Sequence, residues 1–477
     1  MTRQMPTLVM NYIPQSEKFS SMVAGRETVW YWIIFGLGLF WTLFLCLNSP
    51  GVYLHDEIGH FLISQNAWNY PELILDVWGR PINTMLYMVP APLGLSFARL
   101  LSLFMAGLTV WLTTRVAKKS GVERLYLIPL MLWFQPWFND FSYQVITEVP
   151  LSLGMIAGTF LWLKGRENVA AVLFGLLPLI RHEGIALSVA YCFFMFYRRK
   201  WSAGLLTILP LTGYNLLYFA ALHDWPIRIF FNAQLTDQYG SGSWFHYVPR
   251  LVYRAGLPVM VLAITALTIV WKQRERFLYL AIYSIYFLLH VIIFRFGLFA
   301  SGGYTIFLLP LAPALAIIAA LGGERLLNYL KELQSSTGIL SSRRLRYALI
   351  CTGAAFILST GFISRPNPVD EDGLAMQEAA QWIREKGYSK EHITSCHVWF
   401  VYYYNLPWTP DGRWDTPVDL VALPNESLVI WDRHYSEQWG ISLNYLSDAH
   451  NGWKKLKDFH SGIAVLFQKD MSGVKKN

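Results

Sequence analysis

The sequence predicts a polytopic α-helical membrane protein with about eleven transmembrane helices, followed by a small C-terminal α/β domain on the extracytoplasmic side. Of its 477 residues, 54% are hydrophobic and 15% are charged, whereas a soluble protein carries about 25% charged residues. Eleven apolar segments divide the chain, and several are shorter than the ~20 residues that cross a bilayer core. These segments end at residue 363, where the composition changes.

The basic residues between the apolar segments set the orientation of the chain. They fall in alternate loops, which hold RVAKK at 115–119, KGR at 164–166, RRK at 198–200, KQRER at 272–276 and RRLR at 343–346. The positive-inside rule places these loops in the cytoplasm. Most of the net charge of +8 lies there, so it reports topology and contact with anionic membrane lipid rather than nucleic acid. We therefore expect the remaining loops to carry the function at the outer surface.

The predicted transmembrane domain covers residues 1–363 and includes an outer-face loop at 48–96. Segment 81–95 is apolar but is broken by Pro81, Pro90 and Pro92. A span here would put RVAKK outside, so we interpret the segment as juxtamembrane or re-entrant, which is tolerated where protein or a wet cavity covers it. The eleven predicted spans are 28–47, 97–114, 124–138, 149–163, 167–180, 184–197, 202–222, 255–271, 277–294, 303–321 and 346–363.

Residues 364–477 are predicted to form a small soluble α/β domain. After a Pro-rich acidic linker, LAMQEAAQWIREKGY is typical of an amphipathic helix ended by Gly387. HITSCHVWFVYYY, ESLVIWDRHY and GIAVLFQKD are typical of strands, and WKKLKDF is predicted as a short turn or helix. The alternation favours an α/β domain, and the odd number of spans places it on the outer side.

The cysteines indicate neither a disulfide framework nor a zinc site. Cys46, Cys192 and Cys351 lie in apolar segments, Cys396 stands apart, and no CxxC pair occurs. The first apolar run is long enough to span and lacks a clear small-residue cleavage site. A cleavable signal peptide is therefore not expected.

The first candidate site follows the first span directly, in His55-Asp56-Glu57-Ile58-Gly59-His60. If a helix starts here, Asp56 and His60 lie one turn apart on one face, and Glu57 is three residues from His60. This arrangement can hold one carboxylate as a general base beside a neighbour that orients it. The plain alternative is a helix start at which acidic residues favour the helix dipole.

The second candidate is Glu148, at the start of a span on the same predicted face as Asp56. An acid in this position is a candidate for a site in a membrane protein. The alternative is a simple helix start, with Thr147 as a cap and Pro150 in the first turn. Asp140, in the preceding loop, is a weaker candidate because QPWFNDFS is typical of a turn.

The third candidate is the sequence Arg181-His182-Glu183-Gly184, which interrupts two apolar stretches. A guanidinium binds phosphate bidentately, so Arg181 could hold an anionic ligand while His182 adds a donor. The alternative is an Arg–Glu pair in a tight turn. Arg295 ends a span near the same face and is interpreted either as a snorkelling anchor or as a second phosphate contact.

Several familiar motifs are absent from the sequence. We find no P-loop, no GxSxG, no HExxH and no convincing DxD metal pair. The sequence Asp370-Glu371-Asp372 has the look of a metal pair. Because it lies in the acidic linker, we interpret it as solvated.

On these residues the chain resembles the GT-C superfamily of membrane glycosyltransferases, and most closely the enzymes that use polyprenyl-phosphate sugars, such as protein O-mannosyltransferases and lipid A aminoarabinose transferases. The resemblance rests on an ordered set: Asp56-Glu57, Arg80-Pro81, Glu148 and the turn from Arg181 to Gly184. The C-terminal tail resembles the small outer domain of such proteins. One departure is that the family's Arg-Tyr before a late proline is replaced by Gly303-Tyr304.

The resemblance implies an inverting transfer of a sugar from a polyprenyl-phosphate donor to an acceptor hydroxyl at the outer membrane face. Asp56 would be the base, with Glu57 and Glu148 also in the catalytic set, and Arg181 would stabilise the leaving phosphate. Arg295 would then take the place of the missing arginine. The implied substrate-binding residues are His60, Arg80, Asp140, Arg181, His182, Glu183, Arg295 and Tyr304.

The same resemblance implies the partners and the location. The acceptor would be a glycan, a lipid or a protein, the lipid tail would lie in a groove between spans, and the chain would reside in a bacterial inner membrane. The resemblance implies no certain cofactor and leaves a divalent cation open, because some members of the superfamily use one.

Three other functions stay open at this point. A transporter or flippase of lipid-linked glycans often shows two related halves with charges near the midplane, whereas here the charges cluster at one face. An O-antigen polymerase or ligase usually needs no soluble C-terminal domain. An inactive glycosyltransferase-like scaffold is disfavoured by the presence of Asp56, Glu148 and Arg181 together.

Overall fold

The computed structural model describes residues 21–226, 239–299, 302–336, 343–388, 392–410 and 417–470. Contacts divide the chain into two compact units. The helical unit comprises residues 1–44, 102–143 and 147–365, and the mixed unit comprises residues 45–101, 144–146 and 366–477. The loop after the first span thus packs with the C-terminal residues. The division into two separate domains between residues 363 and 364 stays a prediction.

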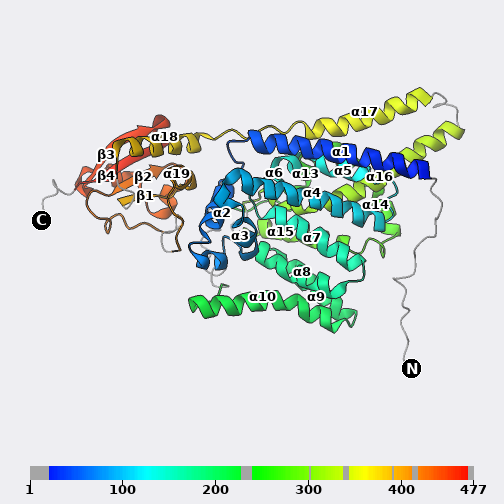
Figure 1. Cartoon of the computed structure of the whole chain (residues 1–477), viewed down its shortest axis with the longest axis horizontal. Coiled ribbons are helices and arrows are strands. Elements are labelled where there is room, and N and C mark those ends of the chain that lie inside the picture. Colours follow the sequence, from blue (N-terminus) through cyan, green and yellow to red (C-terminus); the bar gives the residue numbers. More distant parts are fainter. Residues whose placement is uncertain are drawn as a thin grey trace. The chain divides into compact units, whose positions relative to one another are not determined.

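The helical unit is built from apolar helices that pack against both consecutive and more distant helices of the chain. Helix α8 lies against α7, α9 and α10 (Figure 1), and α16 packs against α5 and α14. The described elements are α1 (Ser21–Asn48), α4 (Leu95–Lys119), α5 (Leu127–Trp133), α6 (Pro136–Phe141), α7 (Glu148–Leu163), α8 (Glu167–Ile180), α9 (Gly184–Tyr197), α10 (Trp201–Leu222), α13 (Tyr247–Ala255), α14 (Leu257–Lys272), α15 (Leu280–Arg295), η3 (Thr305–Leu311), α16 (Ala312–Ser336) and α17 (Arg343–Gly361). Helices α1 and α4 each continue into the mixed unit.

Length and composition confirm a helical membrane protein. Within the described ranges, four helical stretches are long and apolar enough to cross a bilayer: Glu27–Asn48, Leu95–Lys119, Trp201–Leu222 and Thr305–Glu332. The pair α13 and α14, bent by 112°, adds a fifth if it forms one span. Shorter apolar helices include α7, α8, α9 and α15. The count of eleven spans stays a prediction.

Burial distinguishes central from peripheral helices in this unit. In Thr305–Glu332, 83% of the most apolar window is buried, whereas in Trp201–Leu222 only 6% is buried. Helix α10 therefore presents leucines such as Leu205, Leu209 and Leu216 on the surface. Lipid can cover such a surface without cost, since acyl chains are as apolar as leucine.

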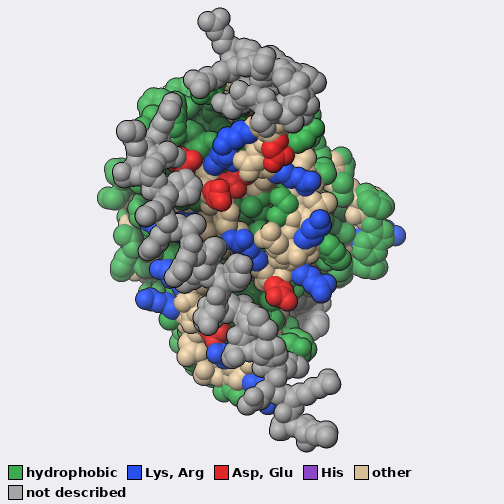
Figure 2. Space-filling model, turned by 90° about the vertical axis from the view of Figure 1, so that its right-hand side faces the viewer, with side chains coloured by type: hydrophobic (Ala, Val, Ile, Leu, Met, Phe, Trp, Pro, Cys, Tyr) green, Lys and Arg blue, Asp and Glu red, His purple; other side chains and the backbone are tan. Residues whose placement is uncertain are grey.

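The five basic loops lie at one end of the helical unit, as their alternation predicts. They lie in the last turns of α4, directly after α7 and α9, at the end of α14 and in the first turn of α17, and Figure 2 shows Lys and Arg side chains gathered around this end. The residues at 118–119, 164–166, 198–200 and 272–276 are exposed. Glu148 starts α7 and Arg181 ends α8, so both lie at the opposite helix ends. Which side of a membrane each end faces stays a prediction.

The single helix predicted over 124–138 is wrong. The chain forms two short buried helices, α5 and α6, with Gln135 extended between them (φ −72°, ψ 125°). The cause is Pro136, which lacks an amide hydrogen and disfavours the helical conformation of the residue before it. Segment 81–95 is likewise broken into α3 (Pro81–Tyr87) and η2 (Ala91–Leu93), in line with the irregular segment predicted there.

The mixed unit contains a four-stranded sheet of order β1-β2-β4-β3, which confirms the small C-terminal sheet. β1 pairs parallel with β2, and β4 pairs antiparallel with both β2 and β3. The sheet buries Val429 and Phe467 against Leu446. The elements are α2 (Asp56–Asn66), η1 (Pro71–Leu75), α3, η2, α18 (Glu371–Lys386), β1 (Ile393–Ser395), α19 (Val398–Tyr404), β2 (Leu428–Asp432), η5 (Ser436–Trp439), α20 (Leu443–Ser447), η6 (Ala449–Asn451), β3 (Trp453–Phe459), η7 (His460–Gly462) and β4 (Ala464–Lys469).

Two local predictions for this unit are wrong. The strand predicted over 392–404 is only three residues long, because His397 caps helix α19 and Asn405 ends it in the left-handed region (φ 57°). WKKLKDF is the strand β3, which pairs with β4 on one side and exposes lysines. Lysine on an edge strand discourages pairing with other chains. The amphipathic helix and its end at Gly387 (φ 72°) are confirmed by α18.

Candidate active site

Glu57 is fixed in a buried ion pair within the mixed unit. Its carboxylate accepts hydrogen bonds from Arg99 Nε at 2.7 Å and Nη2 at 2.9 Å, and from the Val145 amide at 3.1 Å. Both side chains are buried. Arg99 also donates to the carbonyls of Ser49 (2.5 Å) and Gly51 (2.8 Å). One guanidinium thus joins the first turn of α2 to the end of α1 and the start of the loop.

The two adjacent acids therefore differ in what they can do. Asp56 is exposed at the first position of α2, whereas Glu57 is fully buried beside Arg99. Breaking a buried ion pair leaves an uncompensated charge. Asp56 is therefore accessible to solvent, whereas Glu57 is placed to hold α2.

Other predicted binding residues in this unit contact their own loops. The His60 ring stacks on Trp78, with ring centroids 4.5 Å apart and an interplanar angle of 15°. Arg80 Nη1 donates to the carbonyls of Val77 (2.5 Å) and Trp78 (3.0 Å). Arg80 has a φ of 63°, a backbone conformation that residues other than glycine rarely adopt. These contacts shape the turn that leads into α3.

Arg181 brings two candidate acids together in the helical unit. Its Nη1 donates to Glu148 and, at 3.0 Å, to Thr147 Oγ1, and its Nη2 donates to Glu183 at 2.9 Å. Arg181 is only 7% exposed. The tight turn between α8 and α9 fixes the position of Arg181, because α8 ends at the residue before it and α9 starts at Gly184. Gly184 lies so close to the backbone of Leu177 that a larger residue would not fit there. The Arg–x–Glu turn and Glu148 thus form one cluster.

Aromatic rings and a histidine from α15 and η3 adjoin this cluster. Arg181 Cζ lies 4.2 Å from the centre of the Phe307 ring. The Tyr286 hydroxyl donates to the Phe307 carbonyl at 2.7 Å, and the His290 ring lies 4.7 Å from the Tyr286 ring. We call Glu148, Arg181, Glu183, Tyr286 and His290 the Arg181 cluster.

His290 was missed by the sequence analysis. It is fully buried, and neither ring nitrogen has a hydrogen-bond partner among the described residues; the same holds for Arg181 Nε. A usable signal existed, since His290 is the only histidine inside a predicted span. Ionisable residues in membrane segments mark sites more often than not.

The Arg181 cluster has the chemistry of a polar ligand site. An unsatisfied buried polar group costs about 1–3 kcal/mol, so the open polar atoms of this cluster are expected to take a partner, such as water or a ligand. The carboxylates of Glu148 and Glu183 can accept hydrogen bonds from hydroxyl groups of a ligand. Arg181 Nε can donate a hydrogen bond to a phosphate oxygen. The cluster can therefore bind a sugar and can contact a phosphate through Arg181.

The remaining predicted residues of the helical unit have contacts of their own. Asp140 pairs with Arg254 at 3.6 Å. Arg295 Nη1 lies 3.5 Å from the Gly242 carbonyl and its Cζ 5.9 Å from the Trp244 ring centre, as expected of an interfacial anchor. Tyr304 approaches Phe307 with ring centroids 5.9 Å apart. His182 lies in the turn between α8 and α9, next to Arg181.

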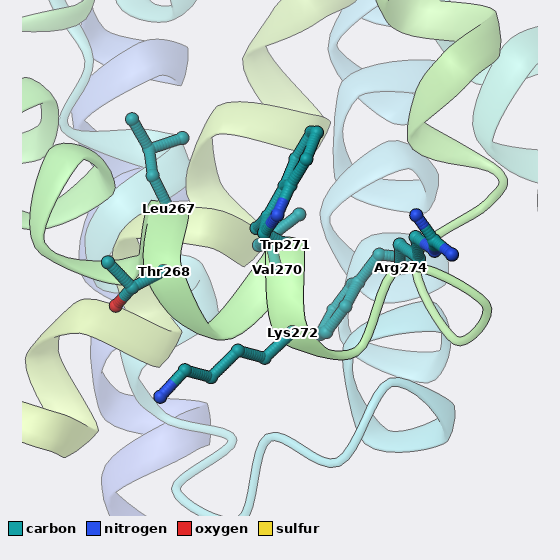
Figure 3. Close-up of a pocket in the computed structure, with 7 residues that line it drawn as sticks. Leu267, Thr268, Val270, Trp271, Lys272 and Arg274 are labelled. Atoms are coloured by element: carbon teal, nitrogen blue, oxygen red, sulfur yellow. The ribbon is translucent and has the colours of Figure 1, made fainter.

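A hollow of about 570 Å³ lies elsewhere, at the end of α14 (Figure 3). Lys272 and Arg274 extend from it in different directions (Figure 3). Its lining contains none of the predicted site residues and consists of Leu267, Thr268, Val270, Trp271, Lys272, Arg274 and Phe277. Trp beside Lys and Arg is typical of a membrane interface, so we assign it no catalytic role.

Comparisons with known proteins show which family model and which fold the chain resembles. The sequence model of glycosyltransferase family 87 matches residues 81–296, a range that contains the whole Arg181 cluster. ArnT from Cupriavidus metallidurans in the apo state is 14% identical, with a TM-score of 0.61, over 96% of this chain and 100% of that one. The same protein bound to undecaprenyl phosphate gives 14%, 0.61, 94% and 100%. The fold is therefore ArnT-like. No curated protein matches the sequence.

Proposed function

We propose that the chain is a GT-C-like membrane glycosyltransferase that transfers a sugar from an undecaprenyl-phosphate donor to an acceptor hydroxyl, with inversion. The match to glycosyltransferase family 87 over residues 81–296 and the ArnT-like fold support this proposal. The reaction would take place at the outer face of a bacterial inner membrane. The ArnT fold, known with undecaprenyl phosphate bound, supports the choice of donor. The acceptor class is a glycan, a lipid or a protein.

Asp56 is proposed as the general base. The acceptor oxygen attacks the anomeric carbon while the bond from that carbon to the phosphate oxygen breaks, and Asp56 takes the acceptor proton. The observation that carries this assignment is the split between an exposed Asp56 and a Glu57 buried against Arg99. Glu57 is thus proposed as a positioning residue, since it fixes the turn from which Asp56 projects.

The Arg181 cluster is proposed to bind the donor. Arg181 Nε would contact the lipid phosphate, where charge grows as the sugar leaves, and a fixed donor at this point lowers the barrier. Glu148 and Glu183 would accept hydrogen bonds from sugar hydroxyls, and His290 would accept or donate one. The leaving phosphate needs no proton, so this step requires no general acid.

The direct test is to incubate the purified full-length chain with a panel of undecaprenyl-phosphate sugars and each acceptor class. We expect release of undecaprenyl phosphate with one sugar, together with a product of inverted anomeric configuration. Release that stays at the level of a no-protein control with every donor and acceptor would contradict the proposal. Product with retained configuration would reject the single displacement.

Replacing His290 by leucine separates a ligand contact from a structural role. Removing a buried polar group without a partner should leave the unfolding temperature unchanged or raise it. If His290 binds sugar, kcat/KM should fall by about 10-fold, the loss of one hydrogen bond of ~1.5 kcal/mol. Thermal unfolding and transfer rate are measured on the same preparation. A stable variant with unchanged kcat/KM would remove His290 from the site.

A further inference from the structure

Three potential metal ligands from distant segments meet in the mixed unit. His55 precedes α2, Asp372 lies in the first turn of α18, and His397 caps α19. Each offers one nitrogen or oxygen atom, and these atoms all lie within 4.8 Å of one another. We call His55, Asp372 and His397 the His–Asp triad. The sequence analysis interpreted Asp372 as a solvated linker residue, but its side chain is only 13% exposed.

His397 has a nitrogen that lacks a partner. The side chain is fully buried, and its Nε2 has no hydrogen-bond partner among the described residues. Its Nδ1 accepts a long hydrogen bond of 3.3 Å from the Trp399 amide. Because Nδ1 accepts this hydrogen bond, the ring is a neutral imidazole, which is the form that binds metals.

One ring nitrogen of His55 contacts a carboxylate, as is typical of a histidine that binds a metal. Its Nε2 lies 2.7 Å from Asp370 Oδ2, and its Nδ1 lies 3.0 Å from the Tyr435 hydroxyl. Histidines that bind metals usually donate their other ring N–H to a carboxylate. With the Nε2 proton directed to Asp370, the Nδ1 lone pair accepts from the Tyr435 hydroxyl, and a metal ion would take the place of that donor.

The charge around the triad favours a cation over an anion. Asp370, Glu371 and Asp372 provide three carboxylates, against one guanidinium from Arg433, which pairs with Glu371 at 3.1 Å and Asp372 at 3.0 Å. Asp372 Oδ2 also lies 3.5 Å from His434 Nδ1, so both carboxylate oxygens of Asp372 face basic groups.

We propose that His55, Asp372 and His397 bind one zinc ion, with water as the fourth ligand. Two imidazoles and a carboxylate suit Zn²⁺ in a tetrahedral site. Ligand distances of about 2.0–2.2 Å require the triad to contract. Binding at His397 Nε2 also moves its proton to Nδ1, at the loss of the weak bond from Trp399. The ion would tie the residue before Asp56 to α18 and α19, and this proposal does not depend on the sugar transfer.

The test uses the full-length protein in detergent, purified without a polyhistidine tag. The protein is stripped with EDTA, given ZnCl₂, desalted and analysed for metal by mass spectrometry. We expect one zinc per chain and a rise in unfolding temperature on zinc addition. Cobalt in place of zinc should give the visible absorption of a tetrahedral site with nitrogen and oxygen ligands.

Three ligand variants and two comparisons make the test specific. Asp372→Asn, His55→Gln and His397→Gln should retain no zinc, and Asp370→Asn should weaken binding by about 10–100-fold. His450→Gln is the matched control, because His450 and Asp448 form an exposed pair at 2.8 Å in the same unit. It should retain one zinc.

Two results would overturn the site: no zinc retained by the unaltered chain, or full zinc retained by the three ligand variants. If the buried His397→Gln variant does not fold, the near-isosteric Asp372→Asn decides the matter. Its size-exclusion profile and metal-free unfolding temperature show whether the fold is intact.

Discussion

Asp56→Asn is expected to lower the rate of sugar transfer by ~10²–10⁴-fold, the usual contribution of a general base. Asparagine keeps the shape of the side chain but cannot take the acceptor proton. Because Asp56 is exposed at the first position of α2, the unfolding temperature should change little. The measurement is release of undecaprenyl phosphate in single turnover, alongside thermal unfolding.

Glu57→Gln provides the contrast that makes the Asp56 result interpretable. Loss of this carboxylate leaves Arg99 buried without its counter-charge, which typically costs about 3–5 kcal/mol. This variant should therefore lose stability first and activity as a consequence. Asp458→Asn, which breaks an exposed pair with Lys455 in the same unit, should change stability by about 1 kcal/mol or less.

The roles would be reversed if Glu57→Gln were stable but inactive and Asp56→Asn retained near-normal transfer. Near-normal transfer by Asp56→Asn alone already removes it from the base role. Loss of transfer together with a lowered unfolding temperature in both variants would mean that the pair is structural.

The helical layout could be predicted because its signals are local. Apolar length and alternating basic loops predict helices and the end at which each loop lies, and the helices from α7 to α10 match their predicted ranges within a residue or two. The prediction failed over 124–138, where one local signal outweighed another. Apolar composition favoured a continuous helix, but Pro136 broke it at Gln135.

The candidate sites could be predicted only in part, because their chemistry depends on long-range contacts. Arg181, Glu148 and Glu183 were chosen from sequence, yet nothing local shows that they share hydrogen bonds. Arg99 looks like any cation near a helix start, and its pairing with Glu57 spans 42 residues. The His–Asp triad is harder still, since His55 lies more than 300 residues from both partners. No spacing motif covers such a distance.

The Arg181 cluster also decides how the donor site must be probed. Arg181→Ala would leave Glu148 and Glu183 buried without a counter-charge, so loss of activity could reflect loss of the fold. Arg181→Lys keeps the charge but removes Nε and the planar guanidinium, which are not replaced by an ammonium group. Arg181→Lys therefore tests the phosphate contact with less disturbance.

For Arg181→Lys we expect kcat/KM with the undecaprenyl-phosphate sugar to fall by about 10²–10³-fold, the effect of losing one donor at a developing charge. The KM for the acceptor should not change. A nitrophenyl glycoside of the same sugar has no phosphate, so any slow transfer from it should be affected much less. Arg325→Lys is the control, because Arg325 donates to Thr268 at 2.8 Å between α14 and α16, outside the Arg181 cluster. The two donors carry the same sugar and differ in the leaving group, so only a contact with the phosphate can make their losses differ. An equal loss with both donors would therefore show that Arg181 acts on the sugar or on the fold.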